Sequence, residues 1–159
     1  TAVGKYPVET VSVMARIIEK AEATVKEWPA PRARRWSHAH AVSHAACTLA
    51  RDMDVAAVVA ITRSGRTAQL VSQGRPNAPI AGFTDDAQVA RRLALWWGVQ
   101  SVVAPFARDT ERALVQMERA LVERGLVQPG DDLIVVGATP LAQRGRANFV
   151  KIQRVARQA

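Results

Sequence analysis

The stretch AVVAITRSGRTAQLV, residues 57–71, determines the fold that we predict for this chain. Its first part is a short apolar run that contains β-branched residues, and its last part repeats apolar residues at helical spacing. Residues 62–67 lie between them and combine hydroxyl groups, a glycine and two arginines. A buried strand that leads through a polar turn into a helix is the repeating unit of an α/β protein with a parallel sheet.

Similar units follow along the chain, and a helix at 38–52 precedes them. We expect strands at 55–61, 79–83, 100–104 and 132–137, with helices at 66–73, 85–97 and 109–124. The final stretch, NFVKIQRV, follows a strand through a polar loop and is therefore expected to pair antiparallel at the sheet edge. The predicted fold is an α/β three-layer sandwich with a mostly parallel five-stranded sheet and an antiparallel edge strand.

The N-terminal part of the chain has a different pattern. Apolar residues recur at three- and four-residue steps from Pro7 to about Lys26, which predicts one amphipathic helix. The segment 28–36 contains two prolines and a basic cluster and is interpreted as a linker. We therefore divide the chain into a helix at 1–27, a linker at 28–36 and an α/β domain at 37–159. The start at Thr1 rather than at a methionine suggests a piece of a longer protein or a processed product.

The charge balance favours an anionic partner. The chain has 22 basic and 14 acidic residues, a formal net charge of +8, and 18 of the basic residues are arginine. The planar guanidinium group matches phosphate, but composition does not distinguish a metabolite from a nucleic acid. The competing interpretation is a genome that favours arginine on solvated helix faces.

Cysteine content and hydropathy indicate the compartment. The single cysteine, Cys47, excludes an internal disulfide and is typical of a reducing environment. The sequence has no apolar stretch long enough to span a membrane and no signal-peptide pattern at its start. We therefore expect a cytoplasmic protein without membrane contact.

The loop at 62–67 is a candidate phosphate cradle. It is expected at the carboxyl end of a buried strand and at the start of a helix, where unpaired N–H groups attract anions. Hydroxyl side chains, a glycine and two arginines are the residue types of such a cradle. The Gly-Lys-Ser/Thr ending of a Walker A loop is missing. Capping of the helix by Ser64 or Thr62, with no ligand, is the alternative.

Several stretches resemble one family. TAVGKYP at 1–7 resembles the end of the catalytic barrel of pyruvate kinases, and TRSGRTAQLVSQGRPNAPIAGFT at 62–84 resembles the effector-loop region of their C-terminal domain. VARRLALWWGVQSVV and PGDDLIVVGATP are also similar to family segments. The family's last loop ends G-x-T-N, whereas this chain reads Gly145, Arg146, Ala147, Asn148, so a threonine is replaced by alanine.

The resemblance implies the place of this chain in a larger enzyme. Pyruvate kinases transfer a phosphoryl group from phosphoenolpyruvate to ADP in glycolysis, giving pyruvate and ATP, and use a barrel-borne lysine, Mg²⁺ and K⁺. Those groups would lie N-terminal to Thr1, so we expect no cofactor, no metal site and no catalytic residue in this chain, and no turnover by it alone. Residues 1–27 would be the last barrel helix, and residues 37–159 the regulatory domain that contributes to a homotetramer.

The resemblance also implies an effector site. By position, the effector phosphate, commonly that of a sugar phosphate, would be held by Thr62, Arg63, Ser64, Gly65, Arg66 and Thr67. The last loop, with Arg144 and Gly145, would close over the ligand, and Arg146 could add charge there. Where some members carry a large aromatic residue and an arginine for a second phosphate, this chain has Phe106 and Ala113, which favours a monophosphate over a bisphosphate.

Other clusters have simpler interpretations. We expect helix or core roles, rather than metal binding, for His38, His40, His44 and Cys47. We expect core or subunit contact for Trp96 and Trp97, and a solvated linker for Arg32, Arg34 and Arg35 with Trp28 and Trp36. We expect helix capping by Asp85 and Asp86, and no acid–base role for Asp131 and Asp132. Two alternatives to a regulatory domain remain. The first is a self-standing sugar-phosphate-binding module, and the weaker second is a basic nucleic-acid-binding domain.

Overall fold

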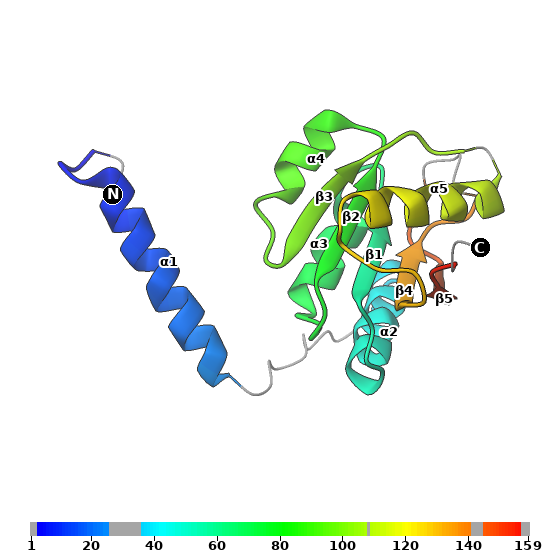
Figure 1. The fold of residues 1–159 in the computed structure, drawn as a ribbon, viewed down its shortest axis with the longest axis horizontal. Coiled ribbons are helices and arrows are strands. Elements are labelled where there is room, and N and C mark those ends of the chain that lie inside the picture. Colours follow the sequence, from blue (N-terminus) through cyan, green and yellow to red (C-terminus); the bar gives the residue numbers. More distant parts are fainter. Residues whose placement is uncertain (1–2, 26–35, 108, 141–144, 157–159) are drawn as a thin grey trace. The chain divides into compact units, whose positions relative to one another are not determined.

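A computed structural model describes residues 3–25, 36–107, 109–140 and 145–156. Its contacts divide the chain into two compact units, Thr1–Ala30 and Pro31–Ala159. Helix α1 (Pro7–Thr24) lies in the first unit, and every other element lies in the second (Figure 1). None of the described helices is long and apolar enough to cross a membrane.

Helix α1 begins at the expected proline, which occupies its first turn, and ends two residues before the predicted limit. None of its residues is buried within its unit. Its apolar side chains form an exposed stripe, which includes Val11, Met14, Ile17 and Ile18. The assignment of residues 1–27 to a barrel and of 28–36 to a linker stays a prediction, and residues 26–35 lie outside the described part of the chain.

The second unit contains one five-stranded sheet, as the sequence predicts. The strands are β1 (Ala57–Ile61), β2 (Ile80–Thr84), β3 (Val99–Val103), β4 (Asp132–Gly137) and β5 (Phe149–Arg154). They lie in the order β3-β2-β1-β4-β5, and β5 is antiparallel to β4 whereas the other neighbours pair in parallel. The mixed α/β sheet with an antiparallel edge strand is therefore confirmed.

Four helices accompany the sheet: α2 (His38–Asp52), α3 (Arg66–Gln73), α4 (Ala87–Leu93) and α5 (Thr110–Glu123). Helix α4 is shorter than the predicted 85–97. It begins after Asp86 because the carboxylate of Asp86 caps it by accepting from the N–H groups of Gln88 and Val89, at 2.7 and 3.3 Å. Helix α4 ends before the two tryptophans. The positive φ of Gly98, 68°, is incompatible with a right-handed helix.

The helices cover both faces of the sheet and make three layers. Alternate residues of β1 point to opposite faces. Val59 and Ile61 join a core with Leu114 and Met117 of α5. Val58 and Ala60 join a second core, which residues of α2, α3 and α4 complete. All five residues of β1 are therefore buried.

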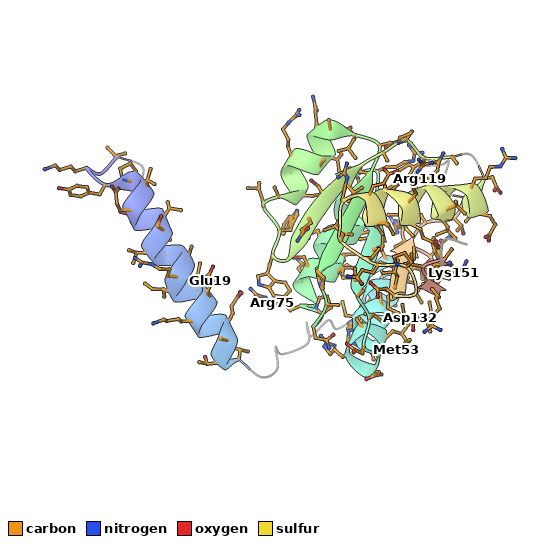
Figure 2. The ribbon with its side chains drawn as sticks, in the orientation of Figure 1. Glu19, Met53, Arg75, Arg119, Asp132 and Lys151 are labelled. Carbon is orange, nitrogen blue, oxygen red and sulfur yellow. The ribbon has the colours of Figure 1, made fainter. Side chains whose placement is uncertain are left out.

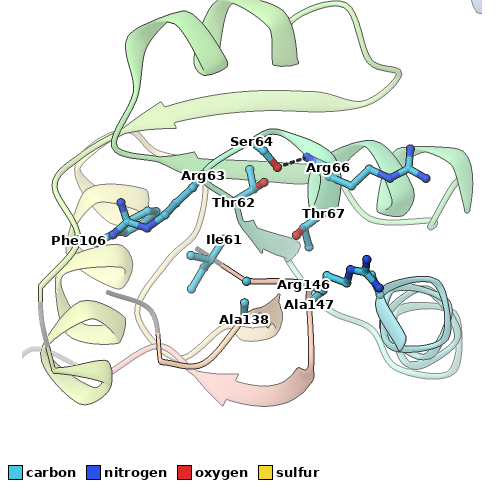
Figure 3. Close-up of a pocket in the computed structure, with 12 residues that line it drawn as sticks. Ile61, Thr62, Arg63, Ser64, Arg66, Thr67, Phe106, Ala138, Arg146 and Ala147 are labelled. Atoms are coloured by element: carbon cyan, nitrogen blue, oxygen red, sulfur yellow. Dashed lines mark hydrogen bonds between the residues drawn. The ribbon is translucent and has the colours of Figure 1, made fainter. Parts of the chain in front are cut away.

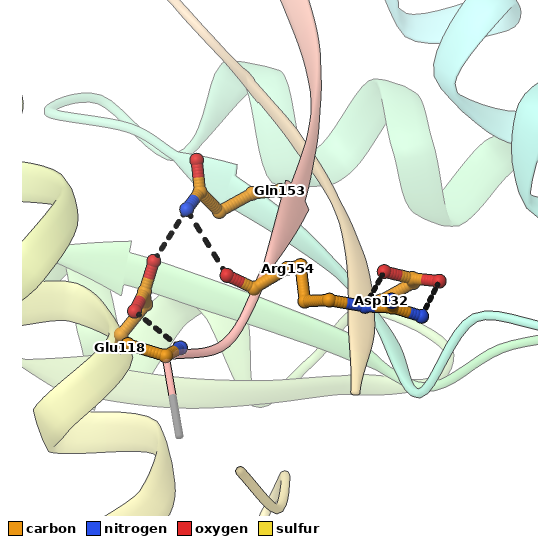
Figure 4. Close-up of polar contacts among 5 residues, drawn as sticks. Glu118, Asp132, Gln153 and Arg154 are labelled. Carbon is orange, nitrogen blue, oxygen red and sulfur yellow. Dashed lines mark hydrogen bonds and ion pairs between the residues drawn. The ribbon is translucent and has the colours of Figure 1, made fainter. Parts of the chain in front are cut away.

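The sheet edges are held by polar contacts. On β5, Arg154 makes two bonds to the carboxylate of Asp132 in β4, at 3.0 and 3.1 Å (Figure 4). The buried carboxylate of Glu118 in α5 accepts from the amide of Gln153 at 2.7 Å and from the N–H of Ala156 at 3.2 Å. On the other edge, the guanidinium of Arg124 donates to the carbonyls of Ser101 and Val103 in β3, at 3.3 and 3.5 Å.

Buried and exposed charges on α5 differ in their surroundings. Arg119, on the solvated side of α5, pairs with Glu123 at 2.7 Å, and 79% and 60% of the two side chains are exposed (Figure 2). Such an exposed pair contributes little to stability. Glu118, by contrast, is 8% exposed and accepts from Gln153 of β5 and from Ala156 just after it, so it links α5 to β5.

Cys47 lies in the core between α2 and α3, where its thiol donates to the carbonyl of Val71 at 3.5 Å. Burial raises the pKa of this thiol from 9.0 to about 11, and the charge of Arg51 opposes part of the shift. The thiolate is therefore scarce at neutral pH, and Cys47 acts as a small core residue.

The raised pKa of Cys47 predicts a loss of stability in alkali. Between pH 9 and pH 11 the unfolded chain loses the thiol proton that the folded chain keeps, so unfolding becomes more favourable as pH rises. Between pH 8 and pH 11 the free energy of unfolding should fall by about 2 kcal/mol more in the wild type than in Cys47→Ala, as measured by urea denaturation. Parallel pH curves for the two proteins would contradict this.

Candidate functional site

The candidate site lies where the direction of the sheet order changes. From β1 the chain passes to β2 on one side, whereas β4 lies on the other side. In open α/β sheets, the gap outside the carboxyl ends of two such strands is the usual ligand position. The loop at 62–65 leaves β1 at this point, and Ala138 follows β4 directly.

A cavity of about 190 Å³ occupies this position (Figure 3). It brings together the loop after β1, the start of α2 and the two ends of the loop between β4 and β5. It is lined by Ala39, Ile61, Thr62, Arg63, Ser64, Arg66, Thr67, Phe106, Ala138, Gly145, Arg146 and Ala147. Six of the eight residues that the sequence predicts for the effector site therefore line it.

Of the predicted residues that the structure describes, Gly65 alone does not line this cavity. Arg144 lies outside the described residues. Gly65 precedes α3 in the left-handed conformation, with φ of 87°, and its N–H donates to the hydroxyl oxygen of Thr62 at 2.9 Å. A Cβ at Gly65 would meet Leu93 Cδ2 at 3.3 Å. The close approach that needs this glycine is therefore to α4.

The start of α3 presents hydrogen-bond donors to the cavity. Its first N–H groups find no acceptor within the helix and carry a partial positive charge. Arg66 N–H lies 3.4 Å from Ser64 Oγ, a weak contact. Thr67 is 8% exposed and lines the cavity, and its hydroxyl has no hydrogen-bond partner among the described residues. A hydroxyl that opens on a cavity in this way can donate to a ligand.

Arg63 is held at one side of the cavity. Its guanidinium makes an ion pair with Asp85, in the loop after β2. The same group lies over the ring of Phe106, 4.7 Å from the ring centroid. Phe106 in turn packs against the buried Phe83, with 5.6 Å between centroids. Figure 3 shows Arg63 and Phe106 together, on the side of the loop away from Arg66.

The other arginines reach the cavity from different elements. Arg66 extends along α3, where its guanidinium donates to Gln69 Oε1 at 2.7 Å. Arg146 lines the cavity from the last loop, near α2 in Figure 3. Three arginines of the described residues therefore line the cavity, and its lining also includes the apolar Ile61 and Ala138.

The last loop is fastened at its base by Asn148. Its side-chain oxygen accepts from the N–H of Thr139 at 2.8 Å, and its amide donates to the carbonyl of Thr139 at 3.0 Å. Ala147, which stands where the family has threonine, is 2% exposed and packs with Ala39 and Leu70. The alanine thus joins the last loop to the helices beside the cavity.

The remaining candidates lie in other surroundings. His40 Nδ1 is 2.7 Å from Ser37 Oγ, and His44 packs edge-on against Trp36. No three His, Cys, Asp or Glu side chains of the described ranges lie together as metal ligands. Trp97 lies against Arg75, 4.5 Å from ring centroid to guanidinium carbon. Arg32, Arg34, Arg35 and Trp28 fall outside the described residues.

Sequence comparison identifies the family. The family model described as "Pyruvate kinase, alpha/beta domain" matches residues 40–153. The chain belongs to the pyruvate kinase family. The match runs from α2 into β5, so the resemblance to the C-terminal domain of pyruvate kinases is confirmed.

Individual relatives agree. A pyruvate kinase of Agrobacterium vitis is 39% identical over 98% of this chain and 33% of its own length. A pyruvate kinase of Clostridium acetobutylicum is 34% identical over 98% of this chain and 34% of its own length. The chain thus spans about a third of the length of these relatives.

Solved structures share the fold. A pyruvate kinase from Cryptosporidium parvum matches with a TM-score of 0.76 and 26% identity, over 96% of this chain and 31% of its own. A second structure from the same organism, in complex with ADP, has a TM-score of 0.73, 26% identity, and coverage of 96% and 32%.

Six of the twelve lining residues of this pyruvate kinase domain lie outside the predicted set, although the family resemblance already points to Arg146 and names Phe106 at the second-phosphate position. Ala39 and Arg146 line the cavity, as does Phe106, which supports Arg63, and Asp85 binds Arg63. Asp85 was interpreted as a helix cap, but the cap is Asp86. The family resemblance marks the loop after β1 and the last loop, and nothing local in the sequence indicates that Asp85 meets Arg63.

Gly65 offers a test of the loop's packing. Gly65→Ala should lower the free energy of unfolding by about 2 to 3 kcal/mol, because alanine is strained at positive φ and its Cβ crowds Leu93. Gly125→Ala is the matched control, since Gly125 has φ of 67° but no atom within 4 Å of the added Cβ; it should cost about 1 kcal/mol. Equal losses in thermal denaturation would refute the contact with α4.

Proposed function

We propose that this chain is the regulatory domain of a pyruvate kinase and that its cavity binds the phosphate of an effector, a sugar phosphate. The observation that carries the proposal is the hydroxyl of Thr67, which lines the cavity at the start of α3 without a hydrogen-bond partner among the described residues. A phosphate there would accept from this hydroxyl and from the first N–H groups of α3.

The predicted site residues keep separate roles in this proposal. Ser64 and Thr67 donate hydroxyl hydrogens, and Arg63 and Arg66 supply charge from two sides. Thr62 and Gly65 fix the turn through their mutual hydrogen bond. Gly145, on the last loop, also lines the cavity, and Arg144 remains a proposed member.

The size and lining of the cavity favour one phosphate. About 190 Å³ is small for a ligand site, and the surface beyond the start of α3 is largely apolar, with Ile61, Ala138 and Ala147. Arg146 is a described cation on the last-loop side. A sugar monophosphate, with its phosphate at α3 and its sugar over the apolar floor, matches this arrangement better than a bisphosphate.

The activity of the whole protein is part of the proposal. The relatives are pyruvate kinases, and this chain corresponds to about a third of each. We infer that the complete protein transfers a phosphoryl group from phosphoenolpyruvate to ADP, giving ATP, in cytoplasmic glycolysis. Mg²⁺ and K⁺ would be held by the catalytic barrel, outside this chain.

The exposed stripe on α1 supports association with other parts of the enzyme. Met14, Ile17 and Ile18 are each at least half exposed, and an apolar helix face of this kind is normally covered. We propose that the catalytic barrel of the same protein covers it and that the complete protein forms a homotetramer. An effector would then regulate activity by binding more tightly to one state of that assembly.

If the effector site is as proposed, removal of the Thr67 hydroxyl should weaken ligand binding. Thr67→Val keeps the branched shape but removes the donor, so the dissociation constant for a hexose monophosphate should rise about tenfold in isothermal titration calorimetry. Arg63→Glu combined with Arg66→Glu should abolish binding while the circular dichroism spectrum stays that of the wild type.

Thr48→Val, on the exposed side of α2, is the control for the loss of a threonine hydroxyl and should bind as the wild type does. Binding by Thr67→Val equal to that of the wild type would place the phosphate elsewhere. Stabilisation of the chain by short DNA, but by no phosphorylated metabolite, would refute both the regulatory domain and the alternative of a self-standing sugar-phosphate module.

The absence of turnover is a separate prediction. With phosphoenolpyruvate, ADP, Mg²⁺ and K⁺, this chain should show no pyruvate formation in an assay coupled to lactate dehydrogenase, because the catalytic groups belong to the barrel. Turnover above the rate without protein would show that the division of labour proposed here is wrong. The gene sequence upstream of Thr1 distinguishes a domain from a self-standing module.

A further inference from the structure

The ion pair between Arg63 and Asp85 bears on how the proposed site works. Arg63 lies at the rim of the cavity and is one of the cations proposed to attract the phosphate. Its guanidinium is bound by the carboxylate of Asp85, which is itself not a lining residue of the cavity. The carboxylate of Asp85 therefore binds the same guanidinium that the effector phosphate would use.

The position of Arg63 is supported from below. Its guanidinium lies 4.7 Å from the ring centroid of Phe106, a distance at which a cation is attracted to the ring face. Phe106 rests on Phe83, which is buried in β2. In Figure 3 the head of Arg63 lies over Phe106, and Ser64 and Thr67 lie toward the start of α3. The guanidinium is thus turned away from the place proposed for the phosphate.

Among the described residues, the carboxylate of Asp85 contacts Arg63 and does not cap a helix. The cap of α4 is Asp86, which accepts from two N–H groups of the first turn. Thr84 provides the preceding contact, since its hydroxyl oxygen accepts from the N–H of Asp86 at 3.3 Å. The carboxylate of Asp85 accepts from the guanidinium of Arg63, and this bond joins the loop after β1 to the loop after β2.

The partial burial of Arg63 and Asp85 strengthens their electrostatic attraction. The side chains of Arg63 and Asp85 are 26% and 29% exposed, so water screens their attraction less than it screens that of Arg119 and Glu123. A bound phosphate that draws Arg63 toward α3 has to replace this carboxylate. A phosphate that leaves the pair intact meets the negative charge of Asp85 nearby. In both cases Asp85 opposes binding.

We propose that Asp85 is an internal competitor of the effector phosphate and sets the affinity of the site by holding Arg63 at Phe106. The inference rests on the proposed effector site and adds a residue that weakens binding to those that strengthen it. The exchange of one anion for another on Arg63 also makes the tie between the two loops dependent on the ligand.

The test measures inorganic phosphate and glucose 6-phosphate binding to the 159-residue chain by calorimetry at fixed ionic strength. Asp85→Asn removes the charge and keeps the shape, and should lower both dissociation constants about tenfold. In the Arg63→Gln background, Asp85→Asn should alter the two dissociation constants by no more than about twofold, because the guanidinium for which Asp85 and the phosphate compete is gone. Circular dichroism checks folding, and Asp85→Ser is a second variant.

Asp132→Asn is the matched control. Asp132 also pairs with an arginine, Arg154, and its side chain is 31% exposed, close to the 29% of Asp85. Asp132 is the first residue of β4, whereas the cavity lies beyond the last residue of this strand. Its replacement should leave phosphate binding unchanged, and an equal gain in both variants would reduce the effect to net charge and overturn the proposal.

The remaining outcomes separate this inference from the proposed function. If the wild type binds phosphate and Asp85→Asn binds it equally well or more weakly, the proposal that Asp85 competes with the phosphate is overturned. Asp85 would then orient Arg63, and the proposed effector site would stand. Binding detected only in Asp85→Asn would support the competitor. Absence of binding in the wild type and in both Asp85 variants would refute the effector site, and the competitor with it.

Discussion

The burial of β1 on both faces is the constraint on which the domain depends. Each of its five residues is buried, with alternate side chains in two separate cores, and its backbone pairs with β2 and β4. A strand of this kind must be apolar throughout, so polar groups appear only where it ends. The chain leaves it at the carboxyl edge, between two neighbours, and the polar residues gather there.

The cavity combines groups that are fixed by different means. The turn at Thr62–Gly65 is held by its own hydrogen bond and by contact with α4, and the last loop is held at its base by Asn148 and Thr139. Arg63 is held by a carboxylate and an aromatic ring. The described backbone of the site is therefore held in place without a ligand, and in the proposed site a ligand would change mainly the pairing of charged side chains.

The sequence predicted the elements well because their signals are local. The apolar runs and the caps fixed the strands and α2, α3 and α5 to within one or two residues. Helix α4 was predicted too long because Leu95 and the tryptophans continue an apolar pattern, while the positive φ of Gly98 is a property of the backbone turn. The loop at 62–67 was predicted from residue type, and the family motif supported it. The contacts of Arg63 with Asp85 and Phe106 could not be predicted, since they join loops that are distant in the chain.

The arginine at the end of α5 affects what the domain can do in solution. An edge strand offers a row of unpaired carbonyls on which a foreign strand can add, and this is a common start of aggregation. On β3, Arg124 occupies the carbonyls of Ser101 and Val103, and its charge faces any incoming chain. The side chain that follows α5 thus covers part of this edge of the sheet. The domain can expose β3 to solvent without offering it as a template for strand addition.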